Sequence, residues 1–245
     1  MQLQKYVEEF MSSEFEGVSI PTSAEERIQM AVDKAYQNTM PPAIKGNTEA
    51  VKKAIYDYLQ QWFEEYLEKK YPRTKEAFEG KYGALCSNFP QFVEVKLKRN
   101  YFKEFGNVQK IINLTFKYLY CLLPEKRDWF TFCHMPLDSY ALGWYYEQAQ
   151  IEPQDDIWHE NTGEGYYKIA GQIDTLIENE EYKGLSPLEV GFIIGPIEKR
   201  KAIVNKLKSA LNGFAEEPVL AGQLSAEQRA SMDAFMQCLE AFRCD

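Results

Sequence analysis

Polar side chains that donate hydrogen bonds recur at helical spacing in the central part of this 245-residue sequence. At 100° per residue, Lys110, Asn113 and Lys117 fall on one narrow face of a predicted helix. Two ammonium groups and an amide on one face can jointly hold an anionic oxygen, because the amide adds directional donors to the positive charge. The spacing therefore predicts an anion-binding site. Further donors in the same segment belong to Arg99, Lys103 and Gln109.

An ordinary amphipathic helix also explains this face, since helices commonly turn lysine towards solvent. The apolar and aromatic residues around the segment instead favour a central position for the helix. A lysine buried there would need a partner, because an isolated buried ammonium is prohibitively costly. The sequence leaves the solvent face and the binding site as alternatives.

About twenty residues further on, His134 and Asp138 flank a Met-Pro-Leu turn. His134 is one of two histidines and could act as a general base or ligand contact, or be a histidine satisfied within the fold. Asp138 has the residue type and position of an N-cap for a helix that begins at Ser139. We place both residues in the predicted anion site, since capping does not exclude binding.

The stretch FGNVQKIINLTFKYLYCL followed by HMPLDSY resembles uncharacterised bacterial or phage proteins that carry an FGxxQKxxNLxxKYLxCL segment and then Pro-x-Asp. The resemblance covers about 40 residues. It implies that one unit is formed by Gln109, Lys110, Asn113, Lys117, Pro136 and Asp138, and it attaches no function to them.

The charge distribution of the sequence limits the classes of partner that the protein is expected to bind. The formal net charge is −9, yet residues 91–128 hold eight Lys/Arg against four Asp/Glu. An acidic chain disfavours broad nucleic-acid binding, so we expect a localised site for a phosphate-bearing ligand or a nucleic-acid end. The competing hypothesis is a protein-interaction module, an inhibitor or accessory factor, whose acidic surface engages a basic protein partner.

The sequence lacks the usual signatures of catalysis and metal binding. It contains no Walker A loop, dinucleotide fingerprint, GxSxG elbow or HExxH helix. The five cysteines show no CxxC pair, and the spacing of Cys and His fits no closed zinc site. We therefore predict no catalytic residues, no metal and no cofactor, and we favour a binding protein over an enzyme.

Helix signals dominate the chain, and the predicted fold is mainly α. Ser23, Ser186 and Ser225 each precede a Glu or Gln by three residues, which is the capping-box pattern. Gly195-Pro196 predicts a break between two late helices. The alternation of apolar and polar residues over 92–98 predicts at most a minor strand, as an edge hairpin or an extended connector, and a helix start is the competing possibility.

We expect a single helical domain over residues 1–245, with two subdomains that meet near the polar stretch 151–165. No run of 18 or more apolar residues is present, and the first residues lack the features of a signal peptide. The sequence thus predicts a cytoplasmic protein without a membrane partner, and it leaves the oligomeric state open.

Overall fold

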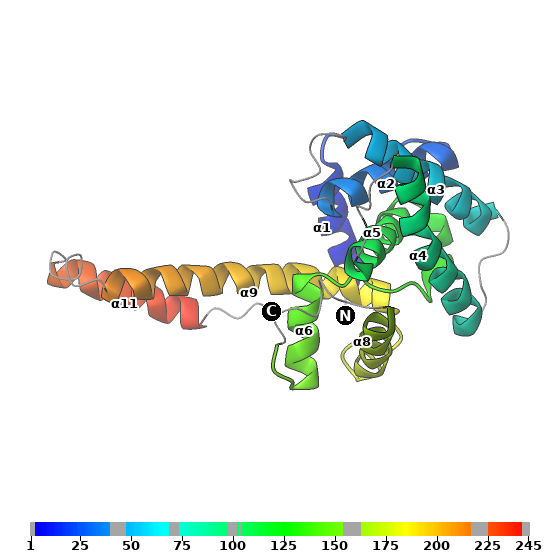
Figure 1. Ribbon diagram of the computed structural model, residues 1–245. Helices are drawn as coiled ribbons and strands as arrows, with labels where there is room; N and C mark the ends of the chain where they lie inside the picture. The colour runs from blue at the N-terminus through cyan, green and yellow to red at the C-terminus, as the bar shows by residue number, and fades with distance from the viewer. Residues whose placement is uncertain are drawn as a thin grey trace. The chain divides into compact units, whose positions relative to one another are not determined.

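The computed structural model describes residues 3–39, 48–68, 74–97, 102, 104–153, 163–216 and 225–241. Every regular element in these ranges is a helix (Figure 1), which confirms the predicted mainly α fold. In chain order the elements are α1 (Leu3–Phe15), α2 (Ala24–Thr39), α3 (Thr48–Glu68), α4 (Lys75–Leu97), α5 (Phe105–Leu122), the 3-10 helix η2 (Pro124–Phe130), α6 (Ser139–Ala149), α8 (Gly163–Leu176), α9 (Pro187–Glu216) and α11 (Ala226–Ala241).

The three predicted capping boxes are confirmed. At the start of α2, the Ser23 hydroxyl donates to the Glu26 carboxylate at 2.8 Å and accepts the Glu26 N–H at 3.2 Å. At α9 the Ser186 N–H donates to the Glu189 carboxylate and the Glu189 N–H donates to the Ser186 hydroxyl, and Ser225 and Gln228 form the same reciprocal pair at α11. These contacts satisfy amide groups that the first turn of a helix leaves without partners.

The predicted strand at 92–98 is wrong for residues 92–97, which form the last turns of α4; Lys98 lies outside the described residues. Val93 is fully buried, whereas 73% of Val95 is exposed, so the two valines do not share a face as they would in a strand. Val93 instead continues the buried face of Leu85 and Phe89 at helical spacing. The alternation of apolar and polar residues over 92–98 is too short to indicate a strand, because the buried residues of the longer segment recur with the helical period of 3.6.

The predicted break at Gly195-Pro196 is also wrong, because α9 continues through Pro196. Proline fixes φ near −65°, which a helix accepts, and costs the hydrogen bond that its missing N–H would make. By contacts the chain forms two units, residues 1–193 and 194–245. Residues 154–162, within the stretch where we expected subdomains to meet, lie outside the described residues.

α5 is the central helix of the first unit and contacts α2, α4, η2 and α8 (Figure 1). Every residue from Ile111 to Leu122 is buried. The solvent-face alternative for Asn113 and Lys117 is therefore wrong, and the central position expected from the flanking residues is confirmed. A helix buried on all sides must find internal partners for each of its polar side chains.

None of the helices in the described part of the chain is long and apolar enough to cross a membrane.

The helical assignment of residues 92–97 gives opposite expectations for two neighbouring valines. Val93→Ala should lower the free energy of unfolding by about 1.5 to 3 kcal/mol, because it removes buried carbon and leaves a cavity. Val95→Ala should raise it by a few tenths of a kcal/mol, because alanine has the higher helix propensity at an exposed position. Urea denaturation measures both, and similar losses at the two positions would contradict the helix.

Candidate functional site

The side chain of Gln109 pairs with the backbone of Leu137 as another peptide group would. Its Nε2 donates to the Leu137 carbonyl at 2.8 Å, and its Oε1 accepts the Leu137 N–H at 3.2 Å. Residues 133–138 form no regular element, and 133–137 are buried, so several of their peptide groups need partners from elsewhere. Gln109 supplies such a partner and thereby holds the segment that carries His134 against α5.

Asn113, one turn further along α5, extends this polar contact. Its Nδ2 lies 3.1 Å from Gln109 Oε1, 3.4 Å from the Met135 carbonyl and 2.9 Å from the Tyr166 hydroxyl. The side chain is fully buried, and its Oδ1 has no hydrogen-bond partner among the described residues. Asn113 therefore joins the 133–138 segment to Tyr166 of α8.

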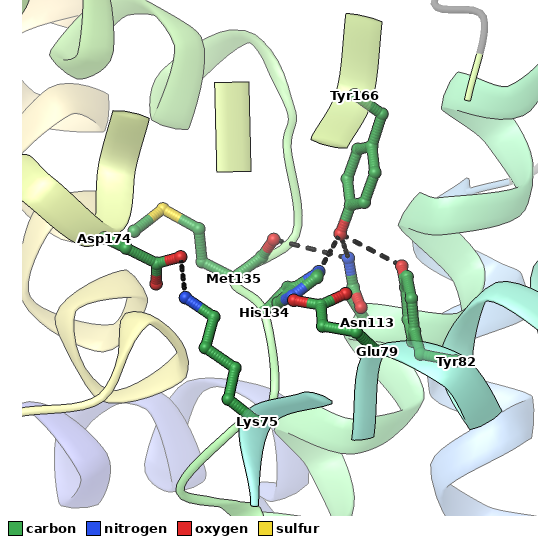
Figure 2. A network of polar contacts seen from close by, with 8 residues as sticks. All are labelled: Lys75, Glu79, Tyr82, Asn113, His134, Met135, Tyr166 and Asp174. Carbon is green, nitrogen blue, oxygen red and sulfur yellow. Dashed lines mark hydrogen bonds and ion pairs between the residues drawn. The ribbon is translucent and has the colours of Figure 1, made fainter. Parts of the chain in front are cut away.

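The Tyr166 hydroxyl is the centre of a polar network that joins α4, α5, α8 and the 133–138 segment (Figure 2). It lies 2.6 Å from His134 Nδ1 and 3.0 Å from the Tyr82 hydroxyl. His134 Nε2 lies 2.8 Å from Glu79 Oε1. Because a carboxylate accepts, His134 Nε2 donates to Glu79, and in the neutral imidazole Nδ1 accepts the Tyr166 O–H. The Tyr166 oxygen then accepts from Asn113.

The network runs from the protein surface to the interior. The Glu79 side chain is 28% exposed, the His134 side chain is 5% exposed and Tyr166 is fully buried. Burial raises the pKa of Tyr166 and of Tyr82 well above the usual value for a phenol, because the charged form loses its hydration. Both phenols are therefore neutral at physiological pH.

A cavity of about 10 Å³ adjoins the network. This volume suits a single water molecule and excludes a nucleotide. At its edge, Asp174 forms an ion pair with Lys75 (Figure 2). The lining residues are His134, Met135, Leu137, Tyr166, Ala170, Ile173, Asp174 and Pro187.

Lys117 is buried on another part of α5. Its Nζ donates to the Gly191 carbonyl at 2.9 Å and lies 4.8 Å from the ring centroid of Phe10 and 4.7 Å from that of Phe192. Desolvation lowers the pKa of the ammonium, while the carboxylate of Asp138 acts in the opposite direction. Among the described residues no carboxylate lies within ion-pair distance of Lys117, so its charge is stabilised by a carbonyl dipole and two aromatic faces.

The remaining predicted site residues take different positions. Asp138 is the N-cap of α6, as its type suggested, and accepts the Tyr140 and Ala141 N–H groups at 3.0 Å. Lys110 is half-buried on α5, and Arg99 and Lys103 lie outside the described residues. The structure therefore joins Gln109, Asn113 and His134 in one network. It also places Asp138 close enough to Lys117 to act on its pKa.

Sequence reasoning missed Glu79, Tyr82 and Tyr166, which complete the network, and Gly191, which accepts from Lys117. These residues are separated from their partners by 32 to 84 positions. Helical periodicity relates residues within one helix, so no spacing in the sequence could have joined them.

Three of the described cysteines, Cys86, Cys121 and Cys133, are buried free thiols. Burial raises the pKa of Cys86 and of Cys121 to about 12, and it raises the pKa of Cys133 well above the usual value for a thiol. These thiols stay protonated and unreactive. No group of three or more His, Cys, Asp or Glu within the described ranges could hold a metal ion.

Comparison with protein-family models, with curated proteins and with solved structures gave no match to this chain.

Two adjacent tyrosines test the network. Tyr166→Phe should lower the free energy of unfolding by about 2 to 4 kcal/mol, because buried groups of His134, Asn113 and Tyr82 lose a shared partner. Tyr167→Phe is the matched control, since the Tyr167 hydroxyl is buried without a hydrogen-bond partner among the described residues. Removal of the Tyr167 hydroxyl should lower the free energy of unfolding by less than about 0.5 kcal/mol. Equal costs in denaturant titrations would contradict the central role of Tyr166.

The lowered pKa of Lys117 makes its contribution to stability depend on pH. The folded state releases the Lys117 proton at a lower pH than the unfolded state, in which the pKa is near 10.5. Unfolding then takes up a proton in this window, so stability rises with pH. The free energy of unfolding of the wild type, minus that of Lys117→Met, should increase as the pH approaches about 10.5. A difference for Lys117→Met that stays flat with pH would contradict the shift.

Proposed function

We propose that the protein binds a small anionic group, such as the phosphate of a nucleotide or of a nucleic-acid end, through the ammonium group of Lys117. The observation that carries this proposal is a buried cation without a carboxylate partner among the described residues. A buried charge is ordinarily paired, because the lost hydration must be replaced by an opposite charge or by several hydrogen bonds.

The described contacts of Lys117 do not use all of the hydrogen-bond donors of its ammonium group. An ammonium group has three donors, and the described acceptor is the Gly191 carbonyl. The rings of Phe10 and Phe192 lower the cost of the charge without accepting hydrogen bonds in the way that an oxyanion does. A phosphate oxygen beside Nζ would supply both a countercharge and a strong acceptor.

The other predicted residues take supporting parts in this proposal. Gln109 and Asn113 use their amide donors within the fold and so position the 133–138 segment, which ends at Asp138, whose carboxylate acts on the pKa of Lys117. The cavity next to Tyr166 is too small for a base or a sugar, so a larger ligand would present its phosphate to Lys117 from outside that cavity.

Thermal unfolding in the presence of inorganic phosphate, ATP and a 5′-phosphorylated oligonucleotide tests the proposal. A ligand at about 100 times its Kd stabilises the folded state by about 2.7 kcal/mol, and at least one of these ligands should raise the Tm of the wild type. Lys117→Met should abolish the shift while the variant stays folded. Lys53→Met, which removes an exposed lysine, should leave the shift unchanged. An equal shift in wild type and Lys117→Met, or none in either, would refute the site.

The distribution of charge favours one alternative, in which the acidic surface engages a basic protein. Residues 1–193 hold 21 Lys/Arg and 30 Asp/Glu, whereas residues 194–245 hold seven of each, so the first unit carries the whole net charge of −9. Such a surface speeds association with a cationic partner, and the effect is screened by salt. A complex that forms at low salt, persists in Lys117→Met and weakens as salt is added would support this alternative.

A further inference from the structure

The second unit contains a basic helical segment within an acidic protein. Between Ile197 and Leu211, α9 carries five basic residues and one acidic residue, although the chain as a whole has a net charge of −9. The basic residues are Lys199, Arg200, Lys201, Lys206 and Lys208. Positive charge this concentrated on one helix favours an anionic partner.

Two of these lysines lie on the same exposed ridge as large apolar side chains. Lys199, Ile203, Lys206, Leu207 and Ala210 follow one another at helical spacing and fall within an arc of about 100°. All five are exposed. Ile203 is 51% exposed and Leu207 is 44% exposed. The ridge therefore offers charge and apolar surface side by side.

The rest of the helix circumference differs from this ridge. Asn205 and Ser209 are exposed and uncharged, whereas Val204 and Leu211 are half-buried. Between Ile197 and Leu211 the exposed apolar side chains are thus confined to one sector, with Lys199 and Lys206 at its edge. The other basic residues, Arg200, Lys201 and Lys208, are half-buried and lie outside this sector. Lysine can lay its carbon chain along apolar surface and extend its ammonium group outward, so this arrangement suits a boundary between an apolar and an anionic phase.

We propose that this ridge, Lys199 to Ala210 of α9, binds the surface of an anionic lipid bilayer. Ile203 and Leu207 would enter the boundary between headgroups and acyl chains, and Lys199 and Lys206 would contact the lipid phosphates. A nucleic acid would use the cations and leave the two large apolar side chains in water, so the lipid surface accounts for more of the ridge. The sequence predicted no membrane partner because no segment spans a bilayer, and a helix that lies on the surface needs no span.

Co-sedimentation with vesicles tests this proposal on the full-length protein. The protein should bind phosphatidylcholine vesicles that contain phosphatidylserine and should not bind vesicles of phosphatidylcholine alone. Each Lys→Glu change at Lys199 or Lys206 should lower the partition coefficient at least about fivefold, the equivalent of about 1 kcal/mol per basic residue near an anionic surface. Ile203→Gln/Leu207→Gln should also abolish binding, because it removes the apolar contact and leaves the charge unchanged.

The control for net charge is Lys5→Glu/Lys53→Glu, which makes the same change in charge at two exposed positions of the first unit. It should keep most of the binding. Circular dichroism establishes that each variant remains helical.

The proposal is overturned if the protein does not bind anionic vesicles, or if the control variant loses binding as fully as Lys199→Glu/Lys206→Glu. Binding of an oligonucleotide that needs the two lysines but not Ile203 and Leu207, with no vesicle binding, would overturn it in favour of nucleic acid. Self-association through Ile203 and Leu207, with no vesicle binding, would overturn it in favour of a second copy of the chain.

Discussion

The burial of α5 on all sides is the constraint on which the first unit depends. Every residue from Ile111 to Leu122 is withdrawn from water, so polar side chains on this helix must find partners inside the protein. Gln109 and Asn113 do so within the segment 133–138, where they bond the Leu137 N–H, the Leu137 carbonyl and the Met135 carbonyl. Two sets of buried polar groups thus satisfy one another. The course of the chain after η2 follows from that mutual satisfaction, and so does the position of His134.

Buried polar side chains at two places on α5 are stabilised in different ways. Around Tyr166, neutral and charged groups form a continuous series of hydrogen bonds that reaches the surface at Glu79. Around Lys117, one ammonium group is held by a carbonyl and two aromatic rings, and its pKa falls because these contacts replace hydration incompletely. A network of the first kind fixes a unique packing arrangement. A cation of the second kind retains capacity for a countercharge, which is why the proposed anion site is placed at Lys117 rather than at Tyr166.

The strand predicted at 92–98 and the break predicted at Gly195-Pro196 are wrong for local physical reasons. Val93 and Val95 alternate with charged residues over a stretch too short to distinguish a period of two from one of 3.6, and the continuation of the Leu85 and Phe89 face decides for the helix. Pro196 stands in a position where its fixed φ fits the helix, so a residue that usually marks a boundary does not produce one. The capping boxes were reliable for the opposite reason, because Ser23 and Glu26 satisfy each other within one turn and need nothing from the rest of the fold.

The sequence by itself determined the helical class, the three capped helix starts, the N-cap at Asp138 and the grouping of Gln109, Asn113 and Lys117 on α5, since each depends on residues within a few turns of one another. The tertiary structure alone decided that Asn113 and Lys117 face the interior. It also decided that Tyr166, Glu79 and Gly191 are the partners of residues on α5 and its neighbouring segment. These contacts join residues from separate helices, and their geometry follows from how the helices pack. Periodicity along the chain carries no information about that packing.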